Sequence, residues 1–113
     1  MGRRARQRSK LAAPTSAYTG ASGDVLELRG SLTPATRREY AALGGAREDA
    51  WHRGVEFLFE RLAVSWAIAG TEPLTRQKEL LARFRMASQD ERRWIRDVLR
   101  EHLAEHFPEL AAP

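Results

Sequence analysis

The chain of 113 residues contains no cysteine. Disulfide bonds, thiolate zinc sites and a cysteine nucleophile are therefore excluded, and the composition fits a reducing compartment. Lysine is also scarce, because 17 of the 19 basic residues are arginine. Together with the abundant alanine, this bias is typical of a GC-rich genome, and we expect a bacterial, cytoplasmic protein.

A long apolar run is also lacking. The longest mostly apolar stretch, residues 55–69, is interrupted by charged side chains and is shorter than a membrane span requires. Residues 11–16 are too polar to form the apolar region of a signal peptide after the basic start. The length corresponds to one domain. We therefore expect a soluble protein that does not associate with a membrane.

The net charge of +4 is concentrated at the beginning of the chain. Residues 1–10 contain five bases and no acid: Arg3, Arg4, Arg6, Arg8 and Lys10. Residues 1–23 show no apolar periodicity and are otherwise rich in small and polar residues. This pattern predicts a disordered basic arm over residues 1–23, whose removal should not affect folding.

Residues 24–113 are predicted to form a single helical domain. Residues 24–29 fit an extended lead-in, which we favour, or a short strand that needs a partner from the arm or from another chain. Four helices should follow, one short and three longer, and their boundaries are indicated by capping signals. We expect them from Pro34 to Gly44-Gly45, over 47–69, from about 73 to 87, and from the capping box of Ser88 and Glu91 to just before Pro108.

The second of these helices is apolar on two sides. Its main stripe contains Trp51, Val55, Leu58, Phe59, Leu62, Trp66 and Ala69, and its second stripe contains Phe57, Val64 and Ile68. A helix of this kind must be covered on both sides. It is either the central helix of the domain or the seam of a homodimer, and we favour the seam because the first helix is short. The predicted fold is thus mainly α, a small bundle of about four helices after the basic arm.

The histidines are the first candidates for chemistry. The segment from His102 to His106 matches the HxxEH string of inverzincin zinc proteases. However, both rings lie on the apolar face of the last helix, and too few residues follow to supply a third ligand. Packing histidines are therefore the favoured interpretation, and His52 is expected to be solvated. No nucleophile, paired carboxylates or phosphate-binding loop stands out, so we predict no enzyme, metal or cofactor.

Arginines on one face of the last helix are the other candidates: Arg92, Arg93, Arg96 and Arg100. With the arm, they are the residues expected to contact an anionic partner. We predict a non-enzymatic interaction or accessory protein that acts through contacts with an unidentified protein. The alternative is a nucleic-acid-associated regulator that binds DNA or RNA through the arm and the arginines of the last two helices. Such contact would be weak and electrostatic, because arginine alone contacts phosphates rather than specifying bases.

Overall fold

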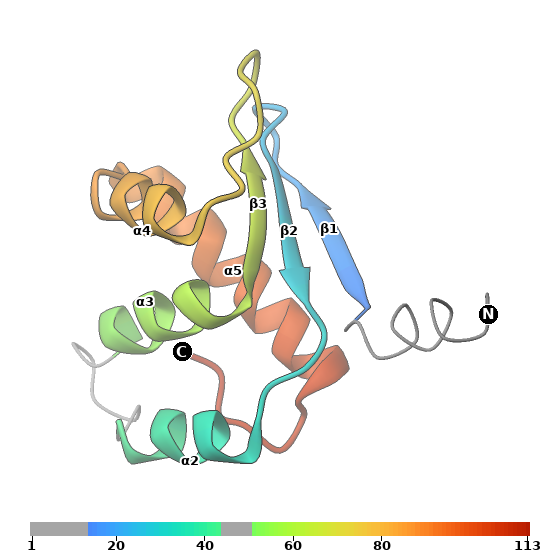
Figure 1. The fold of residues 1–113 in the computed structure, drawn as a ribbon, viewed down its shortest axis with the longest axis vertical. Helices are drawn as coiled ribbons and strands as arrows, with labels where there is room; N and C mark the ends of the chain where they lie inside the picture. Colours follow the sequence, from blue (N-terminus) through green and yellow to red (C-terminus); the bar gives the residue numbers. More distant parts are fainter. Residues whose placement is uncertain (1–13, 44–50) are drawn as a thin grey trace, which may run out of the picture.

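The computed structural model describes residues 14–43 and 51–113, which form a three-stranded antiparallel sheet packed against helices (Figure 1). The elements in chain order are β1 (Thr15–Thr19), β2 (Val25–Arg29), α2 (Pro34–Ala42), α3 (Trp51–Leu62), β3 (Ala63–Ala67), α4 (Gln77–Arg85) and α5 (Gln89–His106). This α+β fold shows that the predicted, mainly α bundle is wrong. The five basic residues of the arm and the predicted start of the second helix at residue 47 lie outside the described residues.

Strands β1 and β2 form a hairpin in the part of the chain that we expected to be disordered or extended. Thr15 pairs with Arg29 and Thr19 with Val25, and the turn uses Gly23 at a φ of +90°. The prediction of disorder is therefore wrong for β1, and residues 24–29 contain a strand instead of a lead-in. The strand has the partner that it requires, because the end of the predicted arm pairs with it.

The predicted helix over residues 47–69 is interrupted after Leu62, where β3 begins without an intervening turn. Trp66 pairs with Leu26, and Val25 pairs with Ala67, so β2 becomes the central strand. The prediction of helix over 63–69 failed because Val64, Trp66 and Ile68 also alternate with the period of a strand. Valine, isoleucine and tryptophan fit a pleated surface well, and the open edge of β2 supplies the pairing partner.

The capping signals at two helix starts are confirmed. The Thr33 side chain accepts a hydrogen bond from the Thr36 amide before Pro34, and Ser88 and Glu91 form both bonds of a capping box. In contrast, α4 begins later than predicted, because Leu74 forms a β-bridge with Trp66 before the helix starts. None of the helices in the described part of the chain combines the length and the apolar character that crossing a membrane requires.

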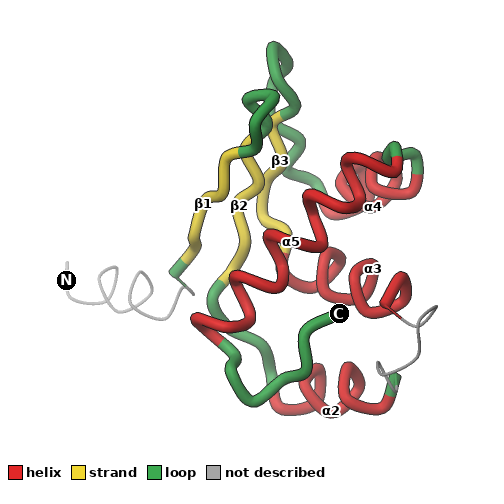
Figure 2. The backbone as a smooth tube through the Cα atoms, turned by 180° about the vertical axis from the view of Figure 1, so that it is seen from behind, coloured by secondary structure: helices red, strands yellow, loops and turns green. Residues whose placement is uncertain are grey.

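The core lies between one face of the sheet and the helices. Figure 2 shows α5 crossing that face, with α3 and α4 beside β3. Leu26, Leu28 and Trp66 from the sheet are fully buried there, as are Phe59 of α3 and Leu99 of α5. Burial of such side chains contributes about 1.5–3 kcal/mol each, so this layer holds the domain together.

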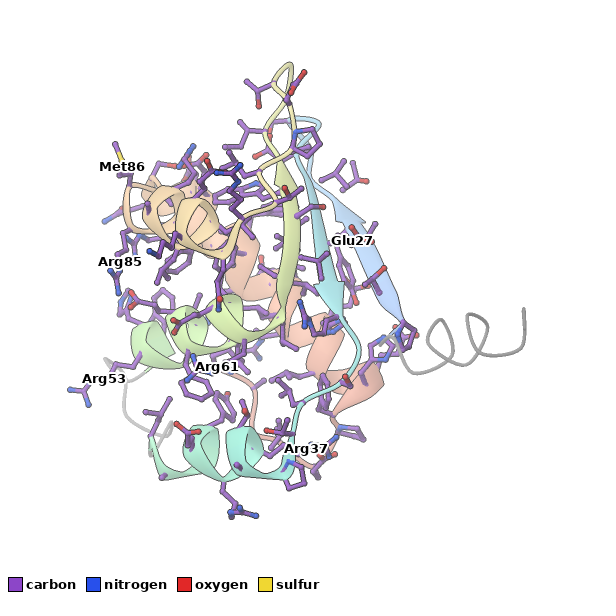
Figure 3. All side chains as sticks on the ribbon, in the orientation of Figure 1. Glu27, Arg37, Arg53, Arg61, Arg85 and Met86 are labelled. Carbon is purple, nitrogen blue, oxygen red and sulfur yellow. The ribbon has the colours of Figure 1, made fainter. Side chains whose placement is uncertain are left out.

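No described element covers the opposite face of the sheet, and its centre is polar. Glu27 of β2 occupies this centre (Figure 3). Its carboxylate accepts hydrogen bonds from the Thr15 hydroxyl (2.6 Å) and the Ser65 hydroxyl (3.1 Å), one from each neighbouring strand. These hydrogen bonds within the sheet explain why a glutamate occupies the centre of this face.

Candidate functional site

Three of the four arginines predicted on the last helix line a cleft between α3 and α5. The cleft has a volume of about 420 Å³ and is lined by Trp51, His52, Gln89, Arg92, Arg93, Arg96 and Asp97. We call it the arginine cleft. Its lining contains three guanidinium groups and one carboxylate, so positive charge prevails among its charged groups.

Arg92 and Arg96 are held in place by main-chain oxygens and by aromatic rings. Arg92 donates from Nε to the Ala87 carbonyl (3.3 Å) and from Nη2 to the Arg85 carbonyl (3.0 Å), and it lies 4.9 Å from the centre of the Phe84 ring. Arg96 donates from Nε to the main-chain oxygen of Pro113 (3.0 Å) and lies 4.4 Å from the centre of the Trp51 ring. Each guanidinium has five N–H donors, so both retain donors for a ligand in a fixed orientation.

The other two arginines differ in their availability. Arg93 also lines the cleft, its side chain is 71% exposed, and its ion pair with the exposed Asp90 is long at 3.6 Å. Such an exposed pair contributes little to stability, so Arg93 can turn towards a ligand at low cost. Arg100 does not line the cleft; its Nη1 donates to the main-chain oxygen of Pro113 (3.1 Å). The sequence pattern therefore grouped four arginines that have three different environments.

Aromatic rings form one wall of the cleft. The rings of Trp51 and His52 stack with centroids 3.6 Å apart. A second cavity of about 310 Å³ shares His52 and Arg92 with the cleft and continues along α3 past Phe57, Glu56 and Glu60. Arg53, which lines this second cavity, points away from α3 in Figure 3. Because they share these two residues, the cavities are adjacent and together border both α3 and α5.

The residues predicted for self-association do not lie on one stripe. Phe57 is on α3, where it packs against Tyr40 of α2 with ring centroids 6.1 Å apart and is covered by Arg61 at 4.4 Å. Val64 is on β3, and Ile68 follows that strand. The helix on which the stripe depended ends at Leu62, so the three side chains belong to different surroundings. Self-association itself stays a prediction.

His102 joins three elements in the core. It is fully buried on α5; its Nε2 lies 2.9 Å from the Arg29 carbonyl oxygen, and its Nδ1 lies 2.7 Å from the Tyr18 hydroxyl. Because a carbonyl can only accept, Nε2 carries the proton and the Tyr18 hydroxyl donates to Nδ1. Both ring nitrogens of His102 are thus engaged within the protein, which leaves neither for a metal ion.

His106 pairs with a serine, which is the contact in the described residues that most resembles a nucleophile and a base. Its Nε2 lies 3.2 Å from the Ser16 hydroxyl oxygen. A catalytic pair also requires a group that orients the base and a place for the substrate. No carboxylate accepts from His106 in the described hydrogen bonds, and neither residue lines the arginine cleft or the cavity beside it. We interpret the pair as a structural contact between β1 and α5.

The burial of His102 makes stability depend on pH. Burial lowers the pKa of His102 below its ordinary value of 6.5, and the neighbouring His106 lowers it further, although the hydrogen bond to Arg29 and the nearby Glu105 oppose this effect. The unfolded chain then binds more protons, so the stabilisation is present above pH 6.5 and is lost as the pH falls through the lowered pKa. We expect the melting temperature to fall on acidification, as measured by thermal unfolding monitored by circular dichroism.

Two histidine variants test this dependence. A glutamine at 102 can donate to the Arg29 carbonyl and accept from Tyr18 without titrating, so His102→Gln should flatten the acid side of the profile. His106→Gln, one turn further on, is the matched control; it removes a smaller contribution to the lowered pKa of His102 but leaves its burial, the largest cause, so it should retain most of the fall. An unchanged profile in His102→Gln would show that another group causes the acid sensitivity.

Two features of the site were missed in the sequence. Trp51 packs against the core, as the stripe predicts, but its stacking on His52 and the place of both rings in the wall of the arginine cleft are not indicated by the sequence. In the sequence, two neighbouring aromatic residues and a separate arginine-rich helix are only a weak indication that they form one site. The contact of Arg96 and Arg100 with Pro113 had no signal at all, because it depends on the return of the chain after α5.

Comparisons of the chain with protein-family models, with curated proteins and with solved structures find no match. The function is therefore inferred from the geometry of the cleft.

Proposed function

We propose that this is a non-enzymatic, cytoplasmic interaction protein that binds an acidic segment of a partner protein in the arginine cleft. The observation that carries the proposal is the fixed orientation of Arg92 and Arg96 beside the exposed Arg93. Guanidinium groups that are already oriented bind carboxylates with little loss of side-chain entropy. The engagement of His102 by Tyr18 and Arg29, and of His106 by Ser16, supports a structural instead of a catalytic use of these residues.

The charge of the described residues favours a short acidic segment over a nucleic acid. Residues 14–43 and 51–113 contain 13 bases and 13 acids. Acids also lie at the binding surface, with Asp97 in the cleft and Glu56 and Glu60 in the cavity beside it. A phosphate backbone that follows this surface would meet both signs of charge, whereas one or two carboxylates match the three arginines.

A single-stranded nucleic acid is the second candidate, and one observation favours it. The stacked rings of Trp51 and His52 lie next to the arginines, and such combinations bind bases and phosphates together. The five basic residues at the start of the chain would add phosphate contacts. Affinity for a nucleic acid should fall steeply and linearly with salt on logarithmic axes, with a slope set by the number of phosphates contacted.

Binding of defined probes tests the proposal. We expect a short fluorescein-labelled polyglutamate peptide to bind, as measured by fluorescence anisotropy, and a polyglutamine peptide of the same length not to bind. Arg93→Gln should weaken binding about tenfold or more, because a hydrogen bond to a charged group contributes about 1.5–3 kcal/mol. The change should leave the melting temperature almost unchanged, because the Arg93 side chain is exposed.

The matched control is Arg38→Gln. This variant removes the same charge from an exposed position on α2 that does not line the cleft. Its affinity for polyglutamate should be close to that of the unaltered protein. Equal losses in the two variants would show that binding follows net charge instead of the cleft. Tighter binding of a single-stranded oligothymidine than of polyglutamate would favour the nucleic-acid candidate.

A further inference from the structure

Strand β1 forms an edge of the sheet, because among the described residues it pairs only with β2 (Figure 1). The Gly20 amide donates to the Asp24 carbonyl (2.8 Å) and the Gly30 amide to the Pro14 carbonyl (2.7 Å), so even-numbered positions direct their backbone groups towards β2. The odd-numbered positions of β1 therefore direct their N–H and C=O groups outwards. The strand itself contains no charge and no proline, so this edge is a template for a further strand.

Helix α5 runs along this edge on the covered face of the sheet. The Tyr18 hydroxyl lies 2.7 Å from Nδ1 of His102, and the Ser16 hydroxyl lies 3.2 Å from Nε2 of His106. Two residues of β1 thus correspond to one turn of α5. The side chain of Ala17, between the two contacts, points to the opposite face. A strand added to β1 would likewise direct every second side chain towards α5.

Two glutamates of α5, Glu101 and Glu105, lie beside the edge. Both residues are exposed, and neither forms an ion pair within the part of the chain that the structure describes. Burial raises the pKa of Tyr18, and the negative charges of Glu105 and Glu101 raise it further, although Ser16 opposes the effect. The two carboxylates therefore act on the edge strand itself.

The spacing of the two glutamates matches that of alternate residues in a strand. Residues four apart on a helix are separated by about 6 Å along its axis. Side chains on the same face of a strand are about 7 Å apart. Two basic residues at alternate positions of an added strand can therefore each meet one glutamate.

A second copy of this chain fits the edge less well. Antiparallel pairing of two β1 strands would continue the sheet with both α5 helices on the same face. The two glutamates of each copy would then approach those of the other, and like charges repel. The charge beside the edge thus favours a basic segment over a second β1.

We propose that the edge of β1 binds an extended segment of a partner protein that has basic residues at alternate positions. Backbone hydrogen bonds to Thr15, Ala17 and Thr19 would supply affinity, and Glu101 and Glu105 would select the basic side chains. This site goes beyond the proposed function and does not rest on it. Figure 2 shows β1 and α3 on opposite sides of α5, so the edge is separate from the arginine cleft.

Two peptides of equal charge test the strand pairing. We expect a fluorescein-labelled peptide of alternating threonine and lysine to bind, as measured by fluorescence anisotropy. A peptide of alternating proline and lysine should bind at least tenfold more weakly, because proline has no N–H for the pairing. Equal affinities for the two peptides would overturn the inference.

Substitutions at Ala17 test the edge from the side of the protein. Ala17→Pro removes an outward N–H but no hydrogen bond to β2, so the hairpin should persist and affinity for the threonine–lysine peptide should fall at least tenfold. Ala17→Thr retains the N–H and should bind as the unaltered protein does. Thermal unfolding checks that both variants are folded. Binding that is unchanged in Ala17→Pro would overturn the inference.

A charge variant keeps the test decisive if Ala17→Pro does not fold. Glu105→Gln, at an exposed position, should weaken binding of the threonine–lysine peptide about twofold to fivefold, the range of an exposed ion pair. Glu79→Gln is the matched control, because Glu79 is exposed on α4, which lies beside β3. Equal affinities in these two variants would overturn the selection of basic side chains.

Two further outcomes would assign the edge to another occupant. If only a variant that lacks residues 1–13 binds the threonine–lysine peptide, the basic start of the chain occupies the edge, and the assignment to a partner protein is overturned. If light scattering finds a dimer that Ala17→Pro dissociates, the occupant is a second copy, and the assignment is again overturned.

Discussion

Replacing Trp66 by alanine is expected to unfold the protein or to leave it marginally stable. The side chain is fully buried, and its ring meets Phe59 edge to face at a centroid distance of 5.7 Å. Its backbone pairs with both Leu26 and Leu74, so the cavity would open where the sheet meets the helices. Truncation of a buried tryptophan costs about 3–5 kcal/mol, and a domain has about 5–15 kcal/mol in total. Urea unfolding monitored by circular dichroism measures this loss.

Trp66→Phe is the matched control. The indole Nε1 of Trp66 has no hydrogen-bond partner among the described residues, so phenylalanine loses volume but no polar contact. Its cost should therefore be clearly smaller than that of alanine. Similar losses for the two variants would show that the size of the cavity does not determine the effect.

Deletion of residues 1–23 is expected to destabilise the protein strongly, contrary to the expectation from the sequence. The deletion removes β1 and with it five backbone pairs to β2. It also removes Tyr18, which leaves Nδ1 of the buried His102 without its donor. An unsatisfied buried polar group alone costs about 1–3 kcal/mol, to which the loss of the strand is added. The protein should show no cooperative thermal transition or a much lower melting temperature.

Two smaller changes separate the contributions to this loss. Deletion of residues 1–13 leaves β1 intact, and we expect its melting temperature to be close to that of the full chain. Tyr18→Phe removes only the hydroxyl donated to His102, so it should cost about 1–3 kcal/mol. If the variant that lacks residues 1–23 has the melting temperature of the full chain, β1 contributes nothing to the stability of the fold.

The candidate site could be predicted only in part. The pattern of α5 placed Arg92, Arg93 and Arg96 near one another, because helical periodicity is local and regular. It could not show that Arg92 caps the end of α4 or that Arg96 reaches Pro113, since these contacts depend on how the chain turns before and after α5. It also gave Arg100 the same role as its neighbours, although that arginine lies outside the cleft.

The sequence by itself determined where two helices begin and which face of α5 is buried. The caps at Thr33 and Ser88 are confirmed. Each cap is a hydrogen bond between residues only three positions apart, so the local sequence contains both partners. The tertiary structure alone decided that β1 and β3 are strands. The segment around Trp66 has a pattern that fits a helix and a strand equally, and β2 selects the strand by pairing Leu26 with Trp66 across 40 positions of the chain. Strand pairing joins distant residues, so no local pattern can specify it.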